Sequence, residues 1–120
     1  MNFVAASVLV QMSMSEQHTF DFMKSLLFKH NFRKMFDFTK KGHFRLICYQ
    51  LQNLTFIYLP KIYQVFHKHS IPCDLYASNW FLTLFSNELS FDIVPNVIDL
   101  YLEEQACGLL KIALSLLAYL

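Results

Sequence analysis

Glycine, proline and charged residues are scarce in this chain of 120 residues. It has two glycines and three prolines, and charged residues make up 16% of it. So few breakers favour helices joined by short connections over a sheet with many turns. They also exclude a glycine-rich loop that could cradle a phosphate group. The sequence therefore predicts an all-α protein and gives no sign of a nucleotide site or of any cofactor.

Cysteine and histidine give no sign of a metal site. The three cysteines, Cys48, Cys73 and Cys107, are odd in number and form no C-x-x-C pair, so neither a disulfide framework nor a zinc site is indicated. We expect buried, reduced thiols in a cytoplasmic protein. His67 and His69 are two residues apart, a spacing that points them to different faces of a helix. We therefore predict no metal site.

The chain also lacks a long apolar run. Its first twelve residues are apolar but have no positive segment before them, and the apolar stretch 106–120 contains Lys111. Fifteen residues fall short of the roughly 20 that cross a bilayer. We expect two buried core helices here and no transmembrane segment. A net charge of +1 gives no general attraction to nucleic acid.

Hydrophobic residues, by contrast, are abundant at 55%, with thirteen phenylalanines and six tyrosines. Their spacing predicts seven helices. The expected ranges are 2–12, 15–30, 43–58, 61–69, 74–87, 92–104 and 106–119, with a short helical turn and a loop at 31–42. Ser15, Asp74 and Asp92 are the expected N-caps. Pro60 either ends the third helix or lies in the first turn of the fourth.

Charge is unevenly distributed along the chain. Residues 74–104 contain six acids and no Lys or Arg, whereas residues 24–45 are basic with Asp37 as the acid among them. Such runs are usually solvated faces or loops, and a partner surface is the alternative. The candidate basic surface is Lys24, Lys29, Arg33, Lys34, Lys40, Lys41 and Arg45.

The segment 76–85, YASNWFLTLF, holds the only tryptophan. On a helix, Tyr76 and Trp80 share one face with Thr83 or Leu84, while Phe81 and Phe85 share the neighbouring face. A segment this aromatic is expected to lie at the centre of the core.

This segment is very similar to the Y-A-S-x-W-F-L-T-L-F signature of the TBC domain of Rab GTPase-activating proteins. Further similarities follow in order, among them Phe32–Phe36, Tyr49–Leu51, Ile98–Leu100 and Ile112–Leu117, which resemble the ecotropic viral integration site 5 and RabGAP-1 subgroup. The residues that carry the signature are Tyr76, Ala77, Trp80, Phe81, Leu82, Phe85 and Asp99. Two positions depart from the family: its usual F-P is Leu89-Ser90 here, and its E-G is Glu104-Gln105.

The resemblance implies a Rab GTPase as partner, a role in vesicle trafficking and a cytoplasmic location at endomembranes. TBC domains supply an arginine from I-x-x-D-x-x-R and a glutamine from Y-x-Q-G to the Rab active site, and neither motif occurs in these 120 residues. We therefore expect residues 1–120 to correspond to a C-terminal part of the domain, beyond both fingers and without its last helices. We predict no catalytic residue and no GTPase activation by this chain.

Two alternatives remain. The chain is either a non-catalytic helical module that binds a Rab or another protein through its basic surface, or a polypeptide that is unstable alone because apolar surface is left uncovered.

Overall fold

The computed structural model describes residues 2–39 and 42–119, which form helices and turns and no strand. The α-helices are α1 (Asn2–Gln11), α2 (Glu16–Lys24), α3 (His43–Tyr58), α4 (Pro60–Lys68), α5 (Cys73–Leu82), α6 (Val94–Glu104) and α7 (Ala106–Ala118). A π-helical turn, η1 (Ser25–Lys29), continues α2, and a short 3-10 helix, η2 (Phe32–Phe36), follows it. The prediction of an all-α fold is confirmed.

Two predicted helix boundaries have the expected local cause. The Ser15 hydroxyl accepts a hydrogen bond from the His18 backbone N–H at 3.3 Å and caps α2. At the other boundary, Pro60 is the first residue of α4, where its missing N–H costs nothing. Leu59 before it leaves the helical region, with φ −131° and ψ 61°. Of the two roles open to Pro60, the first turn of the fourth helix is the correct one.

The helix that carries the aromatic segment is shorter than predicted. We expected it to run to residue 87, but α5 ends at Leu82. Leu84 and Phe85 then take φ values of 49° and 61°, in the left-handed region. Both side chains are fully buried. Their burial therefore compensates for a backbone conformation that costs roughly 1–2 kcal/mol per residue, and packing outweighs helical periodicity.

Two predicted caps are also wrong. The N-cap of α5 is Pro72, and Asp74 lies in the first turn of that helix with Arg45 as its partner. The N-cap of α6 is Ile93, because Asp92 still belongs to the preceding turn.

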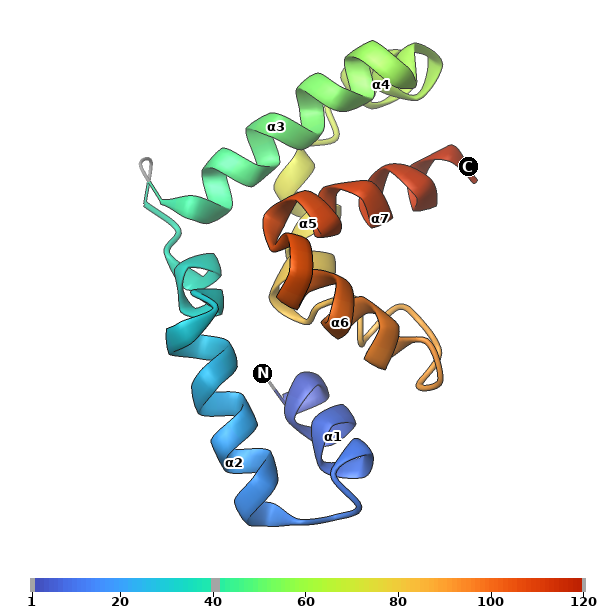
Figure 1. Ribbon diagram of the computed structural model, residues 1–120. Coiled ribbons are helices and arrows are strands. Elements are labelled where there is room, and N and C mark those ends of the chain that lie inside the picture. Colours follow the sequence, from blue (N-terminus) through green and yellow to red (C-terminus); the bar gives the residue numbers. More distant parts are fainter. Residues whose placement is uncertain (1, 40–41, 120) are drawn as a thin grey trace.

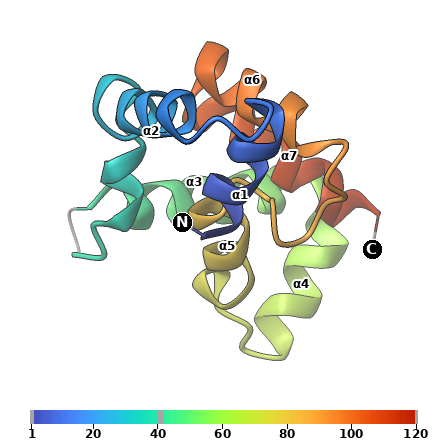
Figure 2. The ribbon, with the colours of Figure 1, turned by 90° about the horizontal axis from the view of Figure 1, so that it is seen from below.

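The helices form an elongated molecule of 48 × 30 × 22 Å. Helix α5 packs against both α3 and α7, whereas α1 packs against α2 and α6 (Figure 1). The view from below shows α4 as a projecting corner, where it packs against α3 (Figure 2). No helix among residues 2–39 and 42–119 has both the length and the apolar character needed to cross a membrane.

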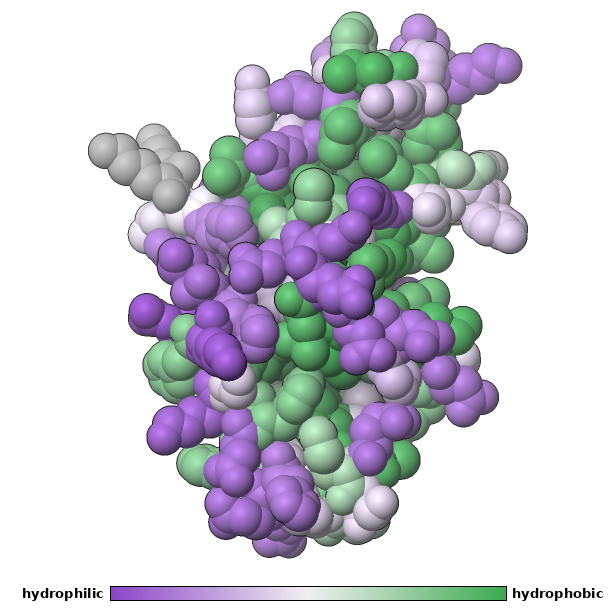
Figure 3. Space-filling model, in the orientation of Figure 1, coloured by the Kyte–Doolittle hydropathy of each residue, from purple (hydrophilic) through white to green (hydrophobic). Residues whose placement is uncertain are grey.

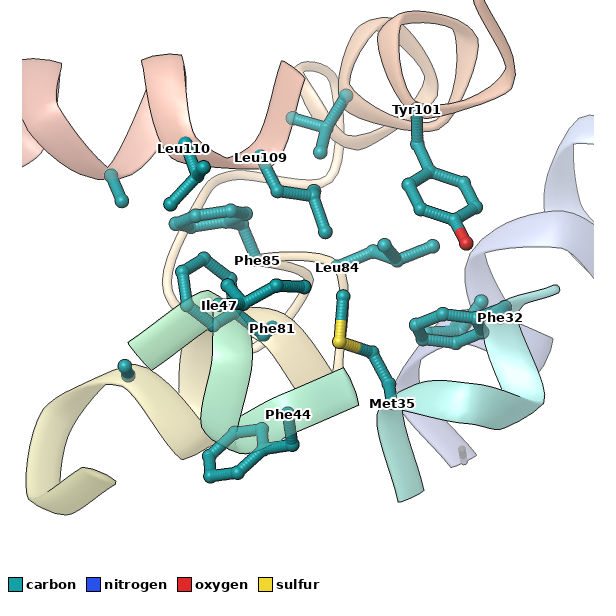
Figure 4. Packing of buried hydrophobic residues seen from close by; sticks show 14 of the residues in the cluster. Phe32, Met35, Phe44, Ile47, Phe81, Leu84, Phe85, Tyr101, Leu109 and Leu110 are labelled. Carbon is teal, nitrogen blue, oxygen red and sulfur yellow. The ribbon is translucent and has the colours of Figure 1, made fainter. Parts of the chain in front are cut away.

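The core is continuous through the elements around α5 (Figure 4). Phe81 and Phe85 are fully buried at its centre, beside Leu109 of α7 and Ile47 of α3. Helix α7 is a core helix, as expected from its composition.

Helix α1 is less buried than its sequence suggests. Val4, Ser7 and Val8 are buried, but Phe3 and Val10 are about half exposed, at 52% and 49%. The expectation of a buried core helix therefore holds for one face only, because α1 lies at the edge of the bundle, against α2 and α6.

Candidate functional site

The aromatic residues of the signature meet in one cluster around α5. Phe66, Tyr76, Trp80, Phe85 and Phe81 form a continuous chain of ring contacts, with centroid distances of 5.2 to 6.1 Å. Each such pair adds about 0.5–1.5 kcal/mol beyond the burial of its area. The structure therefore brings together the four signature aromatics that the sequence singled out.

The two predicted faces of the signature are partly retained. Tyr76 and Trp80 are neighbours on α5, as a helical spacing requires. Phe81 and Phe85 also touch, edge to face, but the turn after Leu82 and not a continued helix makes the contact. The same turn stacks Phe85 on Trp80, a contact that the helical pattern did not predict.

The remaining signature residues are placed differently. Ala77 is fully buried, where α5 faces the core. Leu82 is partly buried against the core. Asp99 lies exposed on α6, apart from the aromatic cluster, beside a small pocket of about 190 Å³. The other residues that line this pocket are Val8, Gln11, Met12, Phe22, Pro95 and Ile98.

A larger pocket of about 390 Å³ lies beside the cluster, between α3, α4 and the start of α5. Its lining residues are Gln52, Thr55, Tyr63, Phe66, His67, Ser70, Ile71, Pro72 and Tyr76. The Thr55 hydroxyl is occupied, since it donates to the Leu51 carbonyl at 2.7 Å. Aromatic walls with a few polar groups suit an apolar side chain that carries one or two hydrogen-bonding atoms.

Sequence reasoning missed this pocket. Its walls come from α3, α4 and the turn before α5, which are separated along the chain. The available signal was the aromatic and polar composition of α4, where Tyr63 and His67 are spaced for stacking and lie with ring centroids 6.1 Å apart.

Two of the three cysteines adjoin this region. Cys48 of α3 and Cys73 of α5 are buried, as expected, but Cys107 is exposed, which corrects the expectation of three buried thiols. A hydrogen bond with the Cys48 side chain lowers the pKa of Cys73. The same interaction, together with burial, raises the pKa of Cys48. Burial also raises the pKa of Tyr76, which lies next to Cys73.

The predicted basic surface is divided. Lys24, Lys29, Arg33 and Lys34 are all exposed on the consecutive elements α2, η1 and η2. Figure 3 shows this flank, on the left, as mostly hydrophilic with apolar residues between. One of these apolar residues is Phe28, whose ring centroid lies 5.6 Å from the Arg33 guanidinium.

One other predicted member does not join this flank. Arg45 lies on α3, where it pairs with Asp74 at 3.3 Å. Lys40 and Lys41 lie outside the described residues.

The described residues contain no group of three or more His, Cys, Asp or Glu side chains that could hold a metal ion. His67 instead contributes to the aromatic pocket.

The sequence of the chain matches the Rab-GTPase-TBC domain over residues 1–120. The chain belongs to the Rab-GTPase-TBC domain family. This membership confirms the resemblance that the aromatic signature indicated, and it makes the chain a homologue of Rab GTPase-activating TBC domains.

Known proteins similar to this TBC chain include members of several named groups. The ecotropic viral integration site 5 ortholog of Drosophila melanogaster is 31% identical over 109 residues, which cover 91% of this chain and 13% of that protein. TBC1 domain family member 4 of Mus musculus is 32% identical over 117 residues, which cover 98% of this chain and 9% of that protein. Rab GTPase-activating protein tbc-11 of Caenorhabditis elegans is 31% identical over 119 residues, which cover 98% of this chain and 12% of that protein. The TBC chain therefore spans only a small part of the length of these relatives.

Proposed function

We propose that this TBC chain binds a Rab GTPase in the cytoplasm, at the endomembranes where Rab proteins act in vesicle trafficking, without accelerating GTP hydrolysis itself. The observation that carries the proposal is the family match over residues 1–120. Two relatives from Caenorhabditis elegans are named as Rab GTPase-activating proteins, which supports a Rab as the partner.

The arginines of the chain support the proposed lack of catalysis. An arginine finger supplied in trans raises the rate of GTP hydrolysis by about 10³–10⁵. The only arginines here are Arg33 and Arg45, and neither stands in an I-x-x-D-x-x-R motif. In the structure Arg33 stacks on Phe28 and Arg45 pairs with Asp74. Each guanidinium group thus has a contact within the chain, at the exposed surface.

Single-turnover hydrolysis tests the catalytic part of the proposal. A panel of Rab proteins is loaded with GTP and mixed with an excess of this chain. We expect the rate to stay within about tenfold of the intrinsic rate, because the finger is the main source of acceleration. A larger increase contradicts the proposal, and Arg33→Ala and Arg45→Ala then show whether either arginine supplies it.

Binding is measured separately on the same panel, with each Rab in its GTP and GDP forms. We expect one or more Rab proteins to bind without any increase in hydrolysis. Absence of binding to every Rab, by a chain whose cooperative thermal unfolding shows it to be folded, contradicts the Rab partner.

A second function is supported by the exposed cations of α2, η1 and η2. Lys24, Lys29 and Lys34 have no acidic partner within hydrogen-bonding distance among the described residues, and they can face an acidic protein surface. The chain would then be a non-catalytic interaction module whose partner is an acidic protein, a Rab or another. Complementary charge of this kind mainly raises the association rate and makes it dependent on salt.

Charge reversal distinguishes this surface from the rest of the chain. We expect Lys24→Glu combined with Lys29→Glu to weaken the binding of the acidic partner protein about tenfold or more at low salt. The matched control is Lys61→Glu combined with Lys68→Glu, two exposed lysines of α4 with the same change in charge. Charge reversal of Lys40 and Lys41, the two other lysines of the predicted surface, extends the test. Equal binding by all these variants rules out the basic surface.

A further inference from the structure

Cys48 and Cys73 lie on two helices that pack against each other, α3 and α5. Both side chains line one hollow of about 270 Å³ at the surface. They are not completely enclosed, since 6% of Cys48 and 3% of Cys73 remain exposed. Two thiols from separate parts of the chain thus line one hollow that opens to the surface.

The hollow also contains charged groups. Arg45 and Asp74 line it beside the two thiols and pair with each other across α3 and α5. The thiolate is the form of cysteine that reacts with oxidants, and the Arg45 guanidinium lowers the pKa of Cys48, although other effects outweigh it. The Asp74 carboxylate raises the pKa of both cysteines, so the Cys73 thiolate is favoured by hydrogen bonds from Cys48 and Tyr76 and not by the ion pair.

The lower pKa of Cys73 agrees with its role as the first nucleophile. Its main cause is the hydrogen bond with Cys48, which stabilises the thiolate of Cys73. Cys48, whose pKa is raised, is then the resolving thiol.

We propose that Cys48 and Cys73 form a dithiol site that peroxide converts to a disulfide between α3 and α5. The Cys73 thiolate attacks one oxygen of hydrogen peroxide, the O–O bond breaks, and hydroxide leaves to be protonated to water. The resulting sulfenic acid is attacked by Cys48, the S–O bond breaks, and a second water leaves with the proton of Cys48. In total, two thiols and one hydrogen peroxide give one disulfide and two water molecules.

The disulfide changes the region that carries the aromatic pocket. It encloses residues 49–72, which include most of α3, all of α4 and the turn before α5. Gln52 and Pro72 line both the dithiol hollow and the aromatic pocket. The bond therefore fixes α4 and the pocket walls between two anchored helices. This inference does not depend on the proposed Rab partner.

The experiment treats the 120-residue chain with hydrogen peroxide, blocks free thiols with an alkylating reagent and measures the intact mass. We expect the loss of two hydrogens, one alkylated cysteine and recovery of the starting mass with dithiothreitol. Chymotrypsin is the protease for mapping, because no Lys or Arg lies between Cys73 and Cys107. The cross-linked peptide should contain Cys48 and Cys73, with Cys107 alkylated.

Variants and stability complete the test. Cys107→Ser should still form the disulfide, and Cys48→Ser or Cys73→Ser should not. We expect oxidation to raise the melting temperature by on the order of 10 °C, as closure of a loop of this length predicts. A cross-link to Cys107, or free Cys48 and Cys73 after peroxide, overturns the proposal. If a serine variant does not fold, peptide mapping of the peroxide-treated chain without substitutions still shows which cysteines are joined.

Discussion

The Tyr101 hydroxyl of α6 donates a hydrogen bond to the backbone carbonyl oxygen of His30 at 2.9 Å, across 71 residues of sequence. Tyr101 is buried, with 3% of the residue exposed, and its ring meets Phe32 of η2 edge to face, with centroids 5.6 Å apart. His30 directly follows η1, so this one side chain joins α6 to the end of the arm formed by α2 and η1. The basic surface on that arm therefore depends on α6 for its position.

Tyr101→Phe should destabilise the fold by about 1 kcal/mol, the usual net contribution of one hydrogen bond. The ring is retained, so the packing on Phe32 is unchanged, and the loss reports the hydroxyl alone. Urea unfolding measures it. Tyr119→Phe is the matched control, since Tyr119 is 91% exposed and its change should have no effect. Equal stability of both variants contradicts the role of this bond.

The same tyrosine predicts a loss of stability at high pH. Burial raises the pKa of Tyr101 from 10.0 to about 12, so the fold favours the neutral phenol. The neutral Tyr101 phenol stabilises the fold fully below pH 10.0, which is the pKa of tyrosine in the unfolded chain. This stabilisation is lost as the pH rises towards about 12, the pKa in the folded chain. Burial raises the pKa of Tyr76 as well, and it acts in the same direction.

The free energy of unfolding should therefore fall between about pH 10 and about pH 12, which urea titrations at a series of pH values can measure. In Tyr101→Phe the fall should be smaller, with Tyr76 contributing the rest. An identical slope in both proteins would mean that Tyr101 titrates normally.

Phe81→Ala tests whether the signature helix is the centre of the core. Phe81 is fully buried, and removal of such a ring costs about 3–5 kcal/mol. Phe91→Ala removes the same atoms from a side chain that is 48% exposed, and it should cost much less. Thermal unfolding by circular dichroism compares the two, and a similar shift in both would refute the central position of Phe81.

Gly108→Ala tests the close approach of α6 and α7. A Cβ at this position would lie 2.9 Å from Leu100 Cγ and 3.2 Å from the Leu100 carbonyl oxygen. We expect a net destabilisation of about 1–2 kcal/mol from the clash, even though alanine favours helices over glycine by about 1 kcal/mol. Ser115→Ala, at an exposed position of α7, is the control and should change stability little. A more stable Gly108→Ala would show that α6 can move away.

Local signals in the sequence predicted the helices well because their causes are local. A capping hydroxyl at Ser15 and the missing N–H of Pro60 act on neighbouring residues, so the boundaries that they control can be found without a structure. The aromatic signature likewise indicated a buried centre and the TBC family. The end of α5 could not be found in this way, because it depends on the burial of Leu84 and Phe85 against other helices.

The candidate sites were also only partly predictable from the sequence. The basic residues could be read from the sequence, but only the structure separates Arg45, which pairs with Asp74, from the flank of Lys24, Lys29 and Lys34. The aromatic pocket and the dithiol hollow had no comparable signal. Their walls come from α3, α4 and α5, and no local spacing shows which of these residues meet.

The sequence by itself determined the all-α class, most helix starts and the family, since periodicity, capping and an ordered set of motifs are properties of neighbouring residues. The tertiary structure decided where the signature helix turns, that one face of α1 stays exposed, and that Cys48 meets Cys73. These features depend on contacts between residues far apart in the chain. Such contacts form only when apolar burial outweighs the conformational cost of bringing the segments together.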